Sequence, residues 1–124
     1  MNALGTNLTL RLSSGKQRGH EIHVDVRERF LIGRDSHCRL RLRGHNNISR
    51  VHCVIEHQSE GFVVRDCMSK NGTFLNDRRL STIPTTLHTG DMLHVGPFFF
   101  EVDISTEVKR QPPPEDGSTI DWLG

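Results

Sequence analysis

The stretch from Phe98 to Ile104, FFFEVDI, ends in alternating charged and apolar residues, and this period of two is typical of a β-strand with one buried face. Similar short runs occur at Leu8–Leu12, Ile22–Val24, Phe30–Ile32, Leu40–Leu42, Val51–Ile55 and Phe62–Arg65. Turn-forming clusters such as Ser13-Ser14-Gly15 and Gly96-Pro97 separate these runs. No segment of eight or more residues carries a helical stripe with a cap at each end. The pattern predicts an all-β protein, built as an antiparallel sandwich or barrel.

Length and composition favour a single intracellular domain. The chain has 124 residues, of which 34% are apolar, so it is long enough to bury a core. No apolar run approaches the ~20 residues that span a bilayer. The N-terminus lacks the apolar segment of a secretion signal. The three cysteines are an odd number, which argues for a reducing compartment. We therefore expect a cytoplasmic protein, and not a membrane or secreted one.

The composition changes after residue 105. A triple proline at 112–114 precedes an acidic segment that ends at Gly124. We expect a folded domain over residues 1–105 and a disordered, Pro-rich acidic tail over residues 106–124. The folded part has a basic region, because residues 27–50 contain seven arginines and two acidic residues, a net charge of +5. This asymmetry suggests an anionic partner.

Four short polar motifs lie between or beside the expected strands. They are Gly33-Arg34, Ser49-Arg50-Val51-His52, Ser69-Lys70-Asn71-Gly72-Thr73, and Gly90-Asp91 with Gly96. Each motif taken alone has a purely structural explanation. Glycine supplies a positive φ at a strand end, Asn-Gly is a hairpin signal, and a histidine on a strand is commonly buried and hydrogen-bonded. Information about function comes only from their combination and order.

In this order and spacing the motifs resemble the forkhead-associated (FHA) domain, and the resemblance extends from about Asn7 to Ile104. It implies an antiparallel β-sandwich of the FHA/SMAD type with about 11 strands. It also implies a phosphothreonine-dependent protein-interaction module in Ser/Thr kinase signalling. The expected partners are a phosphothreonine-containing protein or peptide and a Ser/Thr protein kinase. No cofactor, metal, nucleic acid or membrane is expected.

The resemblance assigns binding roles to particular residues. It places Arg34 and Ser49 on the phosphate and Asn71 on the peptide backbone next to the phosphothreonine. A phosphothreonine carries about −1.5 to −2 charges and three acceptor oxygens, so a guanidinium fork beside a hydroxyl donor suits it. Arg50 and Lys70 flank these residues and would add positive charge near the phosphate.

Other residues are expected to support the site. By the same resemblance Gly33, His52 and Gly72 are structural, and His52 is expected to hold the loops together through hydrogen bonds. Asn47 lies in the loop that, in the family, helps to select the ligand residue three positions after the phosphothreonine. Family members often carry an acidic residue near position 39, where this chain has Arg39, so the ligand preference stays open.

Other functional classes fit the sequence less well. Ser49 and His52 are three apart on an expected strand, so their side chains would face opposite sides, and we expect no enzyme. There is no Cys-x-x-Cys pair, and His20 and His23 have strand spacing unsuited to joint metal ligation. The seven Phe and Trp residues fall mostly in core-like positions, which argues against a nucleic-acid binder. The remaining alternative is a phosphorylation-independent interaction or assembly module on the same fold.

The tail contains one further candidate. Thr119, followed by Ile120-Asp121-Trp122, is a candidate phosphorylation site in an acidic segment. Once phosphorylated, it would be a ligand for the same kind of domain, in its own chain or more easily in a neighbouring molecule. The simpler interpretation is a disordered chain end.

Overall fold

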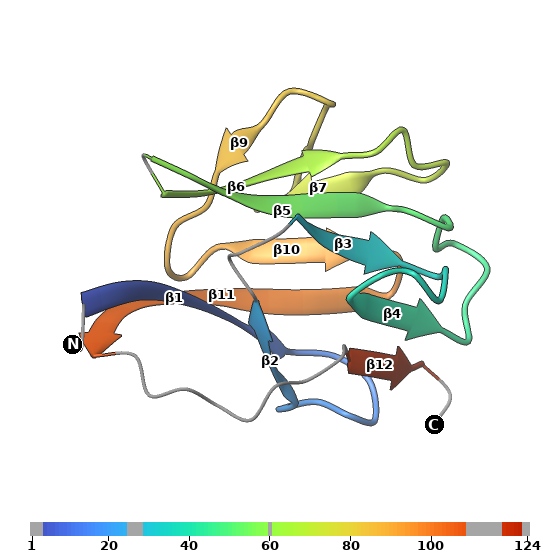
Figure 1. The fold of residues 1–124 in the computed structure, drawn as a ribbon. Coiled ribbons are helices and arrows are strands. Elements are labelled where there is room, and N and C mark those ends of the chain that lie inside the picture. The colour runs from blue at the N-terminus through green and yellow to red at the C-terminus, as the bar shows by residue number, and fades with distance from the viewer. Residues whose placement is uncertain (1–3, 25–28, 60, 109–117, 123–124) are drawn as a thin grey trace.

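The computed structural model describes residues 4–24, 29–59, 61–108 and 118–122, which form two facing β-sheets (Figure 1). The first sheet has the order β2 (Glu21–Val24), β1 (Leu4–Leu12), β11 (Phe98–Val108), β10 (Met92–Val95), β7 (Thr73–Leu75) and β8 (Arg78–Arg79). The second has the order β12 (Ser118–Asp121), β4 (Leu40–Arg43), β3 (Phe30–Gly33), β5 (Cys53–Gln58), β6 (Gly61–Asp66) and β9 (Thr85–Thr86). The predicted β-sandwich is confirmed. The described part of the chain has no helix with the length and hydropathy of a membrane span.

The core lies between the sheets and is built by alternation along each strand. On β1 the side chains of Leu8, Leu10 and Leu12 are buried, and they pair in antiparallel register with Ile104, Val102 and Phe100 of β11. The intervening residues face outward, as the two-residue period requires. The second sheet contributes the following fully buried side chains: Ile32, Leu40, Leu42, Ile55, Phe62 and Val64.

The second sheet is mixed rather than wholly antiparallel. β12, β4 and β3 run parallel to one another, whereas β3, β5, β6 and β9 are antiparallel neighbours. The C-terminal ends of β3 and β4 therefore lie at the same end of the sandwich, on the right in Figure 1. This direction brings the segments after Gly33 and after Arg43 to one end of the molecule.

The prediction of a disordered tail is wrong for the part of the tail that the structure describes. β11 continues beyond residue 105 to Val108, and Ser118–Asp121 form a strand along the edge of β4. Ile120 is fully buried and Trp122 packs against the core. Burial of these two large apolar side chains favours docking of the segment on the core. The acidic composition of the tail did not reveal this contribution. The triple proline lies outside the described residues.

Two local predictions also differ from the structure. The strand expected from Val51 begins at Cys53. His52 before it still donates its N–H to Ile32 of β3, but its carbonyl accepts the N–H of Cys67 in the loop after β6. Asn71-Gly72, a hairpin signal by itself, lies in the crossover from β6 to β7, which belong to different sheets. The two-residue turn is formed by Asn76 and Asp77, both at positive φ (51° and 67°), between the paired β7 and β8.

Replacing Ile120 tests whether β12 belongs to the fold. Ile120→Ala should lower the free energy of unfolding by about 2–5 kcal/mol, because it removes a fully buried side chain. The matched control is Thr119→Ala on the same strand, whose exposed side chain should leave stability within about 0.5 kcal/mol. Urea unfolding of both variants provides the measurement, and equal stabilities would contradict the docking of β12.

Candidate functional site

Three loops lie together at one end of the sandwich, at the right of Figure 1. They are residues 34–39 between β3 and β4, 44–52 between β4 and β5, and 67–72 between β6 and β7. Strand directions cause this, because β3 and β4 end where β5 begins and β6 ends. The loops carry all the residues predicted to bind or select the ligand, whereas the candidate phosphorylation site Thr119 lies outside them.

Arg34 directly follows β3 and is exposed. Its backbone N–H donates to the carbonyl of Ser49 at 3.0 Å, and its Nε–H donates to the carbonyl of Ile48 at 3.2 Å. The guanidinium has five N–H donors, and the Ile48 carbonyl accepts one of them. The first contact ties the backbone of Arg34 to Ser49, and the second holds its exposed side chain against the loop that carries Ser49.

Ser49 joins the β4–β5 loop to the β6–β7 loop. Its Oγ accepts the backbone N–H of Lys70 at 3.0 Å. This bond uses an oxygen lone pair, so the hydroxyl hydrogen stays available for donation to a ligand. The same contact brings the exposed Lys70 side chain into the cluster.

His52 lies beneath the loops and is fully buried. Its Nδ1 accepts the backbone N–H of Ser49 at 3.1 Å, so the ring proton is on Nε2, which donates to the carbonyl of Gly72 at 2.8 Å. Burial lowers the pKa of His52, against weaker opposing effects of the Gly72 carbonyl and the charge of Asp66. The neutral ring thus ties the two loops together. Both ring nitrogens are occupied by backbone groups, so the ring has no nitrogen left to act as a base on Ser49.

Asp66, at the end of β6, is a second buried anchor that the sequence analysis missed. Its carboxylate accepts the N–H of Ser69 at 2.9 Å, the Ser69 hydroxyl at 2.5 Å and the Thr73 hydroxyl at 2.7 Å. The Ser69 oxygen in turn accepts the N–H of Gly72. An aspartate at a strand end with a serine three residues later is the signal that could have revealed this closed loop.

Asn71 is exposed at the tip of that loop. Its side-chain amide lies 3.4 Å from the carbonyl oxygen of Asn47 and 3.5 Å from the Asn47 Oδ1. Asn47 is exposed as well, and its N–H donates to the ring of His45. The two asparagines therefore lie side by side across the loops, in long and readily exchanged contacts.

Two glycines allow the close approach of backbone at this end. A Cβ on Gly33 would overlap the carbonyl oxygen of Arg50, which accepts the N–H of Asp35. A Cβ on Gly96, at φ +57°, would overlap the side chain of buried Ile48. The absence of a side chain at Gly96 therefore lets Ile48 pack there, which positions the loop that carries Asn47 and Ser49.

The structure thus brings Arg34, Ser49, Lys70, Asn71 and Asn47 together, with Gly33, His52 and Gly72 beneath or beside them. Arg50 is exposed on the same loop, with its carbonyl directed toward Asp35. Thr119 is separate. It lies exposed on β12, opposite Arg41 of β4.

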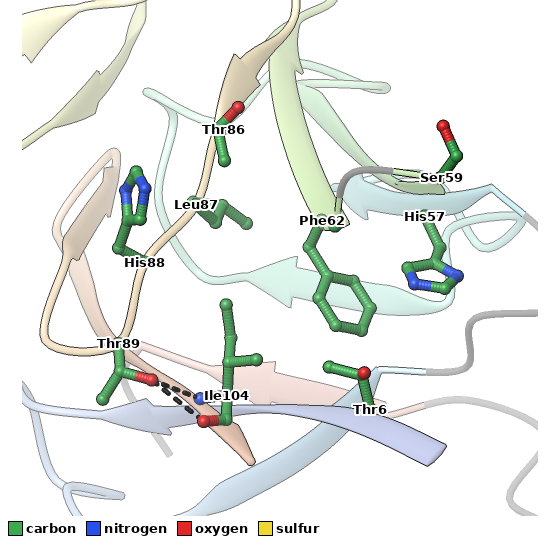
Figure 2. Close-up of a pocket in the computed structure, with 10 residues that line it drawn as sticks. Thr6, His57, Ser59, Phe62, Thr86, Leu87, His88, Thr89 and Ile104 are labelled. Atoms are coloured by element: carbon green, nitrogen blue, oxygen red, sulfur yellow. Dashed lines mark hydrogen bonds between the residues drawn. The ribbon is translucent and has the colours of Figure 1, made fainter. Parts of the chain in front are cut away.

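A separate hollow of about 440 Å³ lies at the other end of the sandwich, lined in part by the β5–β6 hairpin (Figure 2). His57, Phe62 and His88 line it, together with Thr89, whose hydroxyl bonds to both backbone groups of Ile104. It contains none of the predicted binding residues. We do not assign the ligand-binding site to this hollow, because it lies at the opposite end of the sandwich from the basic loops.

Metal and thiol chemistry find little support at the loop end. Among the described residues no group of three or more His, Cys, Asp or Glu side chains is arranged to hold a metal. Cys38, Cys53 and Cys67 are free, and burial raises the pKa of each thiol. Protonated thiols of this kind act as small apolar side chains.

Fold and loops together define a β-sandwich interaction module that presents basic and amide side chains from three loops at one end. The family model of the FHA domain matches residues 30–96, more than half of the chain, and the chain belongs to the FHA domain family. Domains of this family are protein-interaction modules.

Solved structures of FHA domains are similar to this chain. One, from work on phosphothreonine-dependent FHA interactions, is 26% identical, with a TM-score of 0.67 over 77% of this chain and 94% of that one. The FhaA FHA domain, solved in complex with the intracellular domain of another protein, has the same identity and TM-score, and the match covers 77% of this chain and 99% of that one.

The fold also resembles that of a longer protein. Mycobacterium tuberculosis EmbR, solved with a low-affinity phosphopeptide, has a TM-score of 0.71 and 24% identity over 84% of this chain and 26% of its own. At this identity the likeness concerns the fold. Among curated protein sequences, none is significantly similar to this chain.

Asp66→Asn tests the closed β6–β7 loop. The amide would present N–H groups to a donor that now meets carboxylate oxygen, so the free energy of unfolding should fall by about 1–3 kcal/mol. Asp77→Asn is the matched control, because Asp77 is exposed and asparagine tolerates its positive φ. Chemical denaturation of the two variants would contradict the role of Asp66 if their midpoints were the same.

His52 should make stability depend on pH. Because its pKa is lowered in the folded state, the unfolded chain binds a proton more readily, and stability decreases as the pH falls below about 6.5. The slope approaches at most ~1.4 kcal/mol per pH unit for one proton. Following the His52 ring by NMR between pH 8 and pH 5 checks this directly. A ring that titrates at or above its usual pKa would contradict the prediction.

Proposed function

We propose that this chain is a phosphothreonine-dependent protein-interaction module of Ser/Thr kinase signalling. The observation that carries the proposal is the position of the Arg34 guanidinium and the Ser49 hydroxyl. Arg34 donates its N–H to the carbonyl of Ser49 and its Nε–H to the carbonyl of Ile48, the residue before Ser49. The N–H of Ser49 is in turn bonded to the ring of buried His52. Such a preorganised pair suits a doubly charged, three-oxygen anion, because no loop has to be reorganised on binding.

Neighbouring residues give each part of the ligand a partner. Arg34 and Ser49 would bind the phosphate, and Lys70, anchored through its backbone to Ser49, would add an ammonium nearby. Arg50 would add longer-range attraction from the loop surface. The Asn71 amide has both a donor and an acceptor, so it would bind the peptide backbone beside the phosphothreonine.

Ligand selection would involve Asn47, because it lies next to Asn71 on the exposed side of the loops. The basic residues at this end favour acidic partners. The proposed class of partner is cytoplasmic proteins phosphorylated by a Ser/Thr kinase. Thr119 is itself a candidate phosphorylation site, since its side chain is exposed on β12. Its backbone would first have to leave β4 to enter a kinase.

The expected affinity is modest. Hydrogen bonds to charged groups contribute about 1.5–3 kcal/mol each, and ordering of a flexible peptide offsets part of that sum. We expect a micromolar dissociation constant, which corresponds to a binding free energy of about −8 kcal/mol. The phosphate contacts would supply a large share of it.

A phosphothreonine peptide library, with the best peptide also made without phosphate, tests the proposal. The phosphopeptide should bind with a micromolar Kd and its unphosphorylated twin should not bind measurably. Arg34→Ala should abolish measurable binding and Ser49→Ala should weaken it about tenfold or more. Arg78→Ala, which removes one exposed positive charge on β8, should change the Kd less than twofold. Calorimetric titration provides all five measurements.

The alternative, a phosphorylation-independent interaction module on the same fold, makes the opposite prediction. Partners captured by the wild-type chain would then bind equally well after phosphatase treatment and with Arg34→Ala. That pair of results would exclude phosphothreonine recognition at these loops.

A further inference from the structure

The C-terminal strand β12 is an addition to the part of the chain that matches the family, which ends at residue 96. It pairs in parallel with β4, and the backbone bonds at its two ends are Ser118 N–H to the Arg39 carbonyl, 2.7 Å, and Trp122 N–H to the Arg43 carbonyl, 2.8 Å. Ile120 between them is fully buried. In Figure 1 β12 and β4 lie next to each other and point to the end where the loops gather.

Trp122 occupies the corner between this strand and the first sheet. Its ring meets Phe98 edge to face, with centroids 5.4 Å apart. Gly15 leaves room for it, since a Cβ there would lie 2.8 Å from the indole. On its other side the ring lies against His45, with centroids 6.5 Å apart and an edge-to-face angle of 85°.

These contacts reach the loop that carries Asn47 and Ser49. The loop starts after Arg43, whose carbonyl accepts the Trp122 N–H and whose Nε lies 3.3 Å from the carboxylate of Asp121. His45, against the indole, accepts the N–H of Asn47 through its Nδ1. The far side of the loop is held by Ile48 on Gly96.

We propose that β12, through Trp122, is a positioning element for the ligand-binding loop, so that its docking strengthens phosphothreonine-peptide binding. The inference rests on the proposed function of the same loops. One side of the loop is held by Ile48, and Trp122 and Asp121 hold its start from outside the family-matched region. Without β12 the segment from Arg43 to Asn47 would have to be ordered when the peptide binds, which opposes binding. Trp122 is a positioning residue and touches no ligand.

Binding by three variants of the full chain tests the inference. The probe is the phosphothreonine peptide that the wild-type chain selects from a library. Trp122→Ala should raise the Kd at least fivefold, and Trp122→Phe, which keeps an aromatic ring at the corner, should stay within twofold. Phe62→Leu is the control for general destabilisation, because Phe62 is buried at the opposite end of the sandwich. It should leave the Kd unchanged at temperatures where the chain is folded.

Linkage supplies an independent readout. If docked β12 increases peptide affinity by a given factor, bound peptide must stabilise docked β12 by the same factor. Amide hydrogen exchange at Ile120 and Trp122 in the wild-type chain should therefore slow at least fivefold in saturating phosphopeptide. Trp122 is the single tryptophan, so its fluorescence reports the same event.

The outcomes separate the inference from the proposed function. Agreement between the loss of affinity and the slowing of exchange supports the positioning role. Equal Kd values for wild type and Trp122→Ala, with unchanged exchange, would overturn the inference and leave phosphopeptide binding intact. A wild-type chain that binds no phosphothreonine peptide would overturn both the inference and the proposed function. If Phe62→Leu weakened peptide binding as much as Trp122→Ala, the change in Kd would reflect general destabilisation, and the inference would be overturned.

Discussion

One buried imidazole holds the loop end of this protein together. His52 links the N–H of Ser49 to the carbonyl of Gly72, which lies 20 residues after His52, and it does so in a single neutral tautomer. Its own backbone bonds to Ile32 on β3 and to Cys67 after β6. A buried polar ring must have both nitrogens paired, so the two loops cannot move apart without leaving it unsatisfied.

The polar residues at this end divide into buried residues that support the loops and exposed residues that we propose to bind the ligand. Asp66, Ser69 and Thr73 satisfy one another inside the β6–β7 loop, and no solvent is needed to do so. Arg34 and Asn71 are exposed, and each contacts a backbone carbonyl, at 3.2 Å for Arg34 and in a longer contact of 3.4 Å for Asn71. This division explains how exposed, flexible side chains can be preorganised: the loops that carry them are rigid because their buried groups permit one arrangement.

Strand periodicity predicted an all-β sandwich or barrel, because alternation is a local property and needs no knowledge of the partner strand. The choice of a sandwich came from the resemblance of the motifs to FHA domains. Periodicity could not reveal β12. A strand of four residues in an acidic segment has little local signal, and Ile120 becomes a core residue only because the edge of β4 has room for it. The mixed direction of the second sheet likewise depends on pairing between distant segments.

The amino-acid sequence alone indicated the all-β fold class, and the order of its motifs, through their resemblance to FHA domains, predicted a common binding role for Arg34, Ser49 and Asn71. Only the tertiary structure decided that Asp66 anchors a loop, that both ring nitrogens of His52 form hydrogen bonds to backbone groups, and that the Trp122 ring contacts His45. The physical reason is the range of the interactions. Alternation and turn chemistry act between near neighbours, whereas hydrogen-bond satisfaction of buried groups and packing at a sheet edge join residues that only the folded chain brings into contact.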